Sequence, residues 1–167
     1  MKSVIITVSD RSSKGEREDT SGPLLIKILK EKGWFSHIAY EIVSDDKDKI
    51  ETLLKKYIYN EYNLILTTGG TGLSPRDFTP DATLNVIEKE VPGLAEEMRR
   101  KSREKTPHAL LSRAVAGIKE KTLIINLPGS PKGASENFEA IADAVPHALK
   151  LLEGSVKDCK DEIPGKI

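Results

Sequence analysis

Three short runs of this sequence are almost entirely apolar, and they constrain the fold more than any other feature. The runs are Val4–Val8, Leu64–Leu66 and Leu123–Leu127, and only Thr7 and Asn126 interrupt them. A strand with one face in water would alternate apolar and polar residues, whereas a strand that is covered on both faces need not. The runs therefore predict three buried strands of a parallel sheet.

Segments with the apolar spacing of amphipathic helices lie between these runs. One covers residues 24–29, with Pro23 near its start and Gly33 as its stop, and a second covers residues 50–58. A further strand is predicted at Ile38–Val43, between the two helices. Strands that alternate with helices predict an α/β fold, a three-layer sandwich in which a mostly parallel sheet has helices on both faces.

The second half of the chain predicts more helices and one irregular stretch. Residues 82–90 form a predicted helix with Asp81 placed to cap it, and residues 94–105 form another. Residues 109–118 predict an irregular turn that leads into an edge strand. A last helical face follows Pro131, and Pro146 marks either a kink or the start of a separate terminal helix.

Length and composition predict the general class of protein. A chain of 167 residues without linkers or repeats fits one domain over residues 1–167, with a frayed polar tail beyond Gly154. Lys and Arg total 26, as do Asp and Glu, so overall charge argues against nucleic-acid binding. The single cysteine, Cys159, excludes an internal disulfide. Without a signal peptide or a membrane-length apolar stretch, we expect a cytoplasmic protein with no membrane partner.

Polar loops follow all four predicted strands. They begin at Ser9, at Ser44, at Thr67 and at Pro128. In open α/β sheets, ligands bind outside the carboxyl ends of the strands. If the strands are parallel, four segments that are distant in sequence meet at one edge of the sheet, and a ligand site is predicted there.

The loop over residues 67–81 carries the richest chemistry. It reads Thr-Thr-Gly-Gly-Thr-Gly-Leu-Ser-Pro-Arg-Asp-Phe-Thr-Pro-Asp. Its glycines allow positive φ and close approach of a ligand, and its N–H groups can form an anion-binding nest. Asp77 and Asp81 offer hard oxygen ligands that suit magnesium carried by a nucleotide. The alternative, a tight connection with no ligand, leaves these polar groups unexplained.

Several familiar chemistries lack their sequence signals. No Gly-Lys-Ser or Gly-Lys-Thr follows the glycines, and no Gly-x-Gly-x-x-Gly follows the first strand. No serine lies in a nucleophile elbow, and no histidine adjoins a candidate nucleophile. What remains is positioning and metal-assisted charge stabilisation of a phosphoryl or nucleotidyl transfer.

Five segments together resemble the Mog/MoaB family of molybdopterin adenylyltransferases, which is related to the plant Cnx and animal gephyrin G domains. The segments occur in family order over nearly the whole chain: residues 8–13, Asp45 in Val-Ser-Asp-Asp, residues 67–83, residues 111–114 and residues 126–132. The resemblance implies transfer of AMP from magnesium-ATP to the terminal phosphate of molybdopterin, with release of pyrophosphate.

The resemblance also implies roles for individual residues. Asp77 and Asp45 match the two catalytic aspartates, and one or both would hold magnesium; Asp46 is an alternative to Asp45. The expected substrate-binding residues are Asp10, Ser12, Ser13, Thr68, Gly69, Gly70, Thr71, Gly72, Ser74, Arg76, Asp81, Ser112, Pro128, Gly129, Ser130 and Lys132. Plainer roles stay open for three of them: Asp81 caps a helix, Arg76 pairs with a carboxylate, and Asp10 binds loop N–H groups.

Assembly and partners follow from the resemblance alone. It implies a homotrimer, with a hexamer as the alternative, and a separate protein downstream that inserts molybdenum. A non-catalytic pterin-binding or scaffold member of the same fold is the alternative function. A generic nucleotide phosphohydrolase is a third interpretation, and it would hydrolyse ATP without pterin.

Overall fold

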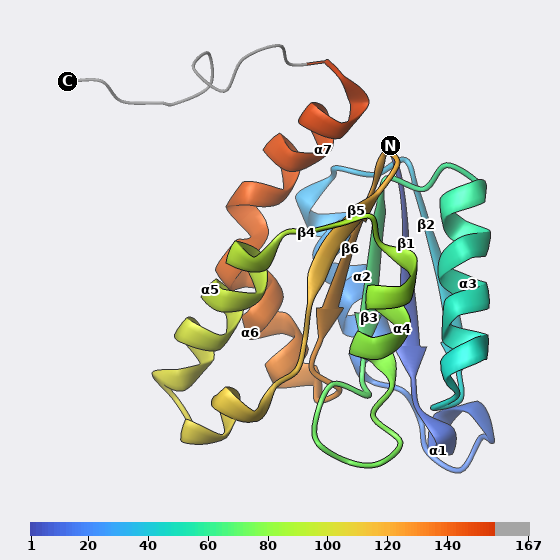
Figure 1. Ribbon diagram of the computed structural model, residues 1–167, viewed down its shortest axis with the longest axis vertical. Coiled ribbons are helices and arrows are strands. Elements are labelled where there is room, and N and C mark those ends of the chain that lie inside the picture. Colours follow the sequence, from blue (N-terminus) through green and yellow to red (C-terminus); the bar gives the residue numbers. More distant parts are fainter. Residues whose placement is uncertain (156–167) are drawn as a thin grey trace.

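The apolar runs form the centre of a six-stranded sheet (Figure 1). In this computed structural model, which describes residues 1–155, the strand order is β2-β1-β3-β6-β5-β4. The strands are β1 (Lys2–Val8), β2 (His37–Val43), β3 (Leu64–Thr68), β4 (Lys89–Glu90), β5 (Ala116–Lys119) and β6 (Thr122–Leu127). β2, β1, β3 and β6 are parallel, whereas β5 runs antiparallel to both of its neighbours.

Helices cover both faces of the sheet, so the predicted three-layer α/β sandwich is confirmed (Figure 1). One face carries α3 (Lys47–Tyr59) and α4 (Thr79–Val86). The other carries α2 (Ser21–Lys32), α5 (Pro92–Arg103), α6 (Pro131–Ile141) and α7 (Val145–Glu153). The short helices are α1 (Asp10–Ser13), η1 (Pro107–Leu111) and η2 (Ala142–Ala144).

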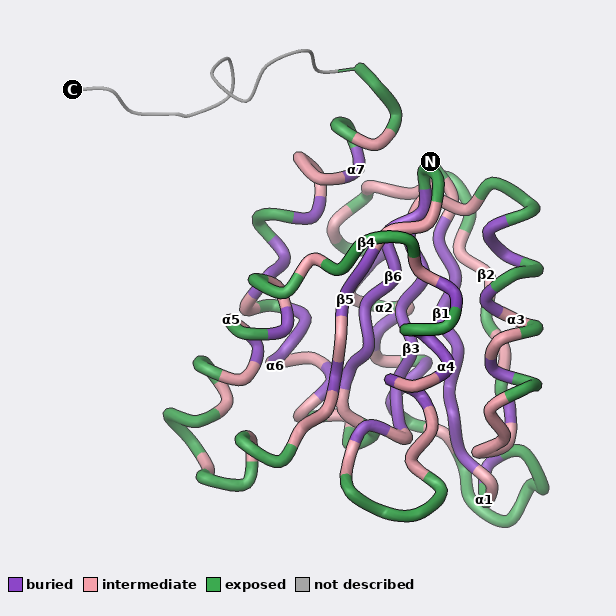
Figure 2. Tube along the Cα trace, viewed as in Figure 1, coloured by how far each residue is buried: buried purple, intermediate pink, exposed green. Residues whose placement is uncertain are grey.

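The sheet separates two hydrophobic cores, which explains why its central strands β1, β3 and β6 are buried and mostly apolar (Figure 2). β1 sends Val4 and Ile6 into the core under α3 and α4, and it sends Ile5 into the core under the other four helices. All three side chains are completely buried. Because successive strand residues point to opposite faces, a strand between two cores needs apolar residues on both faces.

The predicted helix at residues 82–90 is wrong at both ends. α4 begins at Thr79, because the backbone N–H of Thr79 donates to the carbonyl of Gly70 and its hydroxyl donates to the carbonyl of Gly69. The helix ends at Val86, and Lys89–Glu90 pairs with β5 instead. Contacts with distant segments therefore set both boundaries, and they outweigh local helix preference.

Asp81 is consequently not a helix cap. It lies inside the first turn of α4, and its carboxylate accepts a hydrogen bond from the Arg113 guanidinium. The residue at the cap position, Phe78, makes no side-chain hydrogen bond to the helix. The acidic side chain in the first turn still suits the positive end of the helix dipole.

The other predicted elements are largely confirmed. The irregular turn is η1, but β5 is not an edge strand, because β4 pairs along its outer side. α7 is a separate terminal helix that contains Pro146 in its first turn. Cys159 and most of the predicted tail lie outside the described residues. Across residues 1–155, no helix combines the length and apolar character needed to cross a membrane.

Candidate functional site

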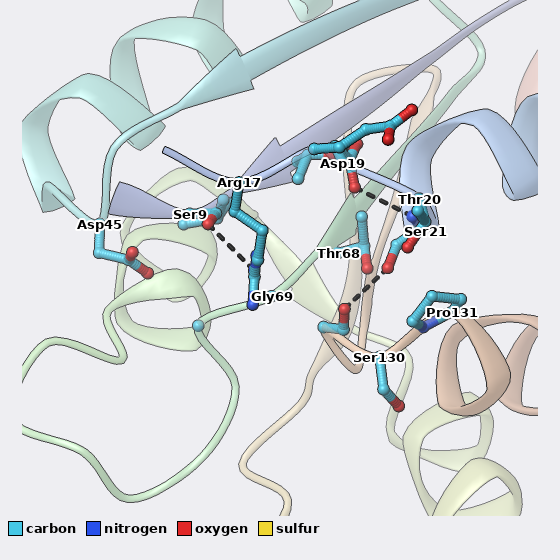
Figure 3. A pocket seen from close by; sticks show the side chains of 15 residues that line it. Ser9, Arg17, Asp19, Thr20, Ser21, Asp45, Thr68, Gly69, Ser130 and Pro131 are labelled. Carbon is cyan, nitrogen blue, oxygen red and sulfur yellow. Dashed lines mark hydrogen bonds between the residues drawn. The ribbon is translucent and has the colours of Figure 1, made fainter. Parts of the chain in front are cut away.

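The loops after β1, β2, β3 and β6 converge on one pocket, as the sequence predicts (Figure 3). The pocket has a volume of about 470 Å³. Its lining residues come from these four loops, from strand ends and from the start of α2: Thr7, Val8, Ser9, Arg17, Glu18, Asp19, Thr20, Ser21, Asp45, Thr68, Gly69, Gly70, Gly129, Ser130 and Pro131. A pocket outside the carboxyl ends of parallel strands is the usual ligand site of such sheets.

The backbone of the glycine loop lies against the neighbouring strands so closely that side chains are excluded. Gly69 has φ of 105°, and a Cβ built on it would lie 2.2 Å from the Val8 carbonyl oxygen. Its N–H donates to the Leu127 carbonyl at 3.1 Å. Gly70 has φ of 63°, and its Cβ would lie 2.5 Å from the Thr79 hydroxyl. Glycine is therefore required at both positions, since other residues would meet both strain and collision.

A buried hydrogen-bond network holds this loop from below. The Asn126 side-chain amide donates to the hydroxyls of Thr67 and Thr83, at 3.0 and 2.9 Å. Thr83 in turn donates to the Thr79 carbonyl at 2.9 Å, and Thr79 donates to the Gly69 carbonyl at 2.8 Å. All four side chains are buried. The network joins β6, β3 and α4 to the loop, so the polar interruption at position 126 in an apolar strand has a structural purpose.

Several N–H groups beside the pocket are free to bind a ligand. Within residues 1–155, the N–H groups of Gly70, Thr71 and Gly72 donate to no protein acceptor. α6 also starts at the pocket, and the Ser130 hydroxyl caps it by accepting from the Gly133 N–H at 3.1 Å. Free N–H groups and a helix start together favour an anionic ligand such as a phosphate.

Two acidic loops and the glycine loop are tied together at the rim. Arg76 donates to both oxygens of Asp10, at 2.7 and 3.0 Å, and to the Asp45 carbonyl at 2.8 Å. Asp10 accepts from the Asp45 N–H at 3.1 Å, and its own N–H donates to Asp45 Oδ2 at 2.6 Å. The hydrogen bond from Arg76 lowers the pKa of Asp10. Both plainer roles are thus present: Arg76 pairs with a carboxylate, and Asp10 binds a loop N–H.

Asp45 is the carboxylate that lacks a partner cation. Partial burial raises its pKa, and the charges of Asp10 and Asp77 raise it further. Among the described residues, no donor reaches its Oδ1, which lies 3.3 Å from a Cβ built on Gly70. The alternative, Asp46, caps α3 by accepting from the Lys49 N–H at 3.1 Å. Asp45 therefore has the free oxygen and the unmet charge that a metal ligand would have.

Asp77 lies in the glycine loop near Asp45 but outside the lining of the pocket. Its Oδ2 accepts from the Ser74 N–H at 2.9 Å, and no donor among residues 1–155 contacts its Oδ1. Those residues contain no group of three His, Cys, Asp or Glu side chains that could hold a metal. Magnesium usually binds one or two carboxylates and completes its shell with water and substrate phosphates, so two aspartates fit such an ion.

A second hollow lies on the other side of the glycine loop. It has a volume of about 330 Å³, and Ser130 lines both hollows. The predicted site residues that line it are Thr71, Gly72, Ser112, Pro128 and Ser130. η1 supplies much of the remaining wall. The predicted site therefore consists of two adjoining hollows, with the glycine loop and the start of α6 between them.

Some predicted site residues line neither hollow. Besides Asp10, Ser74, Arg76, Asp77 and Asp81, these are Ser12, Ser13 and Lys132. The Ser12 hydroxyl is buried without a hydrogen-bond partner in residues 1–155, and Ser13 donates to the Asp10 carbonyl. Lys132 is exposed on α6. The structure brings Ser9 into the pocket in place of Ser12 and Ser13.

Sequence reasoning missed the loop between α1 and α2. It contributes Arg17, Glu18, Asp19 and Thr20 to the pocket, and Ser21 at the start of α2 follows. The Ser21 hydroxyl donates to the Gly129 carbonyl at 2.8 Å, which joins α2 to the loop after β6. No local pattern marks these residues, because they reach the pocket only through the path of the loop.

Comparison with known proteins agrees with this geometry. Residues 4–147 match the family described as "Probable molybdopterin binding domain". The chain is 46% identical to molybdopterin adenylyltransferase of Helicobacter pylori (strain J99) over 90% of this chain and 87% of that protein. It is 39% identical to gephyrin of Dictyostelium discoideum over 95% of this chain, which spans only 23% of that longer protein.

Solved structures share the fold. The chain matches the molybdopterin biosynthesis enzyme MoaB of Thermus thermophilus with a TM-score of 0.84 and 49% identity, over 92% of this chain and 96% of that one. It matches the tungsten cofactor synthesizing protein MoaB of Pyrococcus furiosus with a TM-score of 0.82 and 38% identity, over 90% and 96% of the two chains.

Proposed function

Because this chain belongs to the molybdopterin-binding family that its residues 4–147 match, we propose that it is a molybdopterin adenylyltransferase. It transfers AMP from ATP to molybdopterin in molybdenum cofactor biosynthesis. Relatives that carry this enzyme's name are similar in length to this chain and at least 36% identical to it. The observation that carries the proposal is the pocket at the strand ends, where free N–H groups of the glycine loop lie beside an uncompensated Asp45.

The reaction is a displacement at phosphorus. An oxygen of the molybdopterin phosphate forms a bond to the α-phosphorus of ATP, and the bond from that phosphorus to the bridging oxygen of the β-phosphate breaks. Adenylyl-molybdopterin and pyrophosphate are the products, and no covalent intermediate with the protein is needed. The protein contributes by holding the two anionic substrates in line and by stabilising the charge that develops on the leaving group.

The chain's own residues divide this work. The N–H groups of Gly70, Thr71 and Gly72 bind phosphate oxygens, and the glycines keep the loop close to β1 and β6. Ser130 lies at the junction of the two hollows, where the two substrates meet. Arg76 holds Asp10 and the Asp45 backbone in place, so that the Asp45 carboxylate faces the pocket.

Asp45 and Asp77 are the proposed catalytic residues and magnesium ligands. Magnesium, when bound, neutralises triphosphate charge and activates the α-phosphate as an electrophile. Asp45 would offer its free Oδ1 to the ion, whose positive charge would oppose the partial burial and the charges of Asp10 and Asp77 that together raise its pKa. A homotrimer and a separate molybdenum-insertion partner belong to the proposal through the family resemblance alone, and a cytoplasmic location stays a prediction from the sequence.

Release of pyrophosphate tests the proposal. Purified protein with ATP, magnesium and molybdopterin should release pyrophosphate, and Asp77→Asn should lower turnover by about a hundredfold or more if it removes metal-assisted charge stabilisation. Asp143→Asn, an exposed carboxylate in η2, is the matched control and should keep full turnover. Tight pterin binding without pyrophosphate release would favour the scaffold alternative, and ATP hydrolysis without pterin would favour a phosphohydrolase.

A further inference from the structure

Arg17 is a basic side chain inside the pocket that no part of the family resemblance explains. It lies in the loop between α1 and α2, outside all five segments that carry the resemblance. Its side chain extends into the pocket toward the glycine loop (Figure 3). Among the described residues, it is the only Lys, Arg or His that lines this pocket.

The guanidinium of Arg17 is held in place but is not neutralised. Its Nη2 donates to the Ser9 hydroxyl at 3.2 Å, and within residues 1–155 no carboxylate oxygen lies within 4.0 Å of it. The remaining N–H groups of the guanidinium are therefore available to a ligand. An arginine presents these donors in a planar fork that matches the oxygens of a phosphate.

Two carboxylates of the same loop, Glu18 and Asp19, also line the pocket, and the hydrogen-bond capacity of Asp19 is already used. One of its oxygens accepts from the backbone N–H groups of Ser21 and Gly22, at 3.0 and 3.3 Å. The other accepts from the hydroxyls of Thr7 and Tyr40, at 2.6 and 2.5 Å, and again from Gly22. Burial raises the pKa of Asp19, but these hydrogen bonds outweigh it and the pKa is lowered. Asp19 thus binds the N–H groups at the start of α2, and among the described residues neither it nor Glu18 forms an ion pair with Arg17.

Ser9 adds a second donor beside the guanidinium. Its hydroxyl oxygen accepts from Arg17 and from the Ser12 N–H, both at 3.2 Å, so both lone pairs are used. The hydroxyl hydrogen has no acceptor among the described residues. Ser9 is nearly buried, at 6% exposure, and it lines the pocket. The pair therefore presents donors to whatever occupies the pocket.

We propose that Arg17, positioned by Ser9, binds phosphate oxygens of the substrate in the pocket that it shares with Gly70 of the glycine loop. This inference rests on the proposed function, because it assigns Arg17 to a substrate of that reaction. The shared chemistry is a phosphate group, which either the ATP triphosphate or the terminal phosphate of molybdopterin can supply. We expect the ATP triphosphate, since Arg17 and Asp45 line the same hollow.

Binding measurements on single variants test this assignment. Calorimetric titrations with magnesium-ATP, AMP and molybdopterin would compare the unsubstituted protein with the variants Arg17→Ala, Arg17→Lys and Arg11→Ala. Arg11 is the matched control, because it is exposed in α1 and does not line the pocket. Arg17→Ala should raise the Kd of magnesium-ATP about tenfold, which is the loss expected for one charge-assisted contact that is partly exposed. The same substitution should change the Kd of AMP by less than about twofold. Arg17→Lys should recover part of the affinity for magnesium-ATP.

Each outcome decides the assignment. A rise in Kd for molybdopterin instead of ATP would still support phosphate binding by Arg17, but would place it on the pterin side. Equal affinities of Arg17→Ala and Arg11→Ala for both ligands would overturn the inference. These experiments measure affinity and not turnover. If the unsubstituted protein binds ATP but releases no pyrophosphate, the proposed function is contradicted, and the effect of Arg17→Ala on ATP affinity can still be interpreted. An unsubstituted protein that binds neither ligand would overturn both.

Discussion

Replacement of Asn126 by leucine tests whether the buried network supports the glycine loop. Asn126 is fully buried, and its side chain makes three hydrogen bonds: two from the amide to Thr67 and Thr83, and one from the Val115 N–H to Oδ1 at 3.3 Å. Leucine has nearly the same shape as asparagine but makes none of these bonds. The Val115 N–H would lose its side-chain partner, and Thr67 and Thr83 would lose their hydrogen bonds from β6.

The magnitude follows from these contacts. Two lost hydrogen bonds cost about 1 kcal/mol each, and an unpaired buried N–H costs about 1–3 kcal/mol. Burial of the leucine side chain returns about 1–2 kcal/mol, so the expected loss of unfolding free energy is about 1–4 kcal/mol. For a chain of this size, that lowers the Tm by about 2–16 °C.

Urea unfolding followed by circular dichroism measures this loss, and magnesium-ATP titration measures the effect on the pocket. Asn85→Leu is the matched control, because Asn85 is exposed and its side chain hydrogen-bonds only to Glu51 within residues 1–155. It should change the unfolding free energy by less than about 0.5 kcal/mol. If Asn126→Leu changes the unfolding free energy no more than this control does, the hydrogen-bond network around Asn126 does not stabilise the fold as its geometry predicts.

Two further predictions concern the pocket. The raised pKa of Asp45 means that the folded protein binds this proton more tightly than the unfolded chain, so the ionised group destabilises the metal-free fold above its ordinary pKa of 3.8. Asp45→Asn should therefore raise the Tm at pH 7 in the absence of magnesium. The increase in Tm should become smaller as the pH falls toward 4. An increase that is absent, or that does not depend on pH, would contradict this prediction. Gly69→Ala should lower the unfolding free energy, measured in urea, by more than about 2 kcal/mol, because Gly69 has a positive φ and its Cβ would lie 2.2 Å from the Val8 carbonyl oxygen. Gly93→Ala is the control and should be neutral or stabilising, since its Cβ would meet nothing within 4 Å. Equal effects of the two substitutions would refute the steric argument.

The strands were predictable because burial on both faces leaves a direct mark on sequence. β1 contributes side chains to both hydrophobic cores, so its sequence is a nearly continuous apolar run, which is typical of a strand covered on both faces. The convergence of the four loops followed from the same step, since parallel strands bring their carboxyl ends to one edge. This reasoning needs only the pattern of residues along the chain.

The boundaries of α4 and the role of Arg17 were not predictable in this way. α4 begins at Thr79 because of contacts to Gly69 and Gly70, about ten residues earlier, and a local capping pattern at Asp81 points elsewhere. Arg17 reads as one more exposed charge until the path of its loop places it in the pocket. Such features depend on distances between segments, which residue spacing does not contain.

The central claim is adenylyl transfer, and isotope tracing tests it most directly. ATP labelled with radioactive phosphorus at the α position would be incubated with the protein, magnesium and molybdopterin, in parallel with ATP labelled at the γ position. The account predicts that the α label appears in the pterin product and that the γ label appears in pyrophosphate. Transfer of the γ label to the pterin, or release of inorganic phosphate with no labelled pterin, would contradict it.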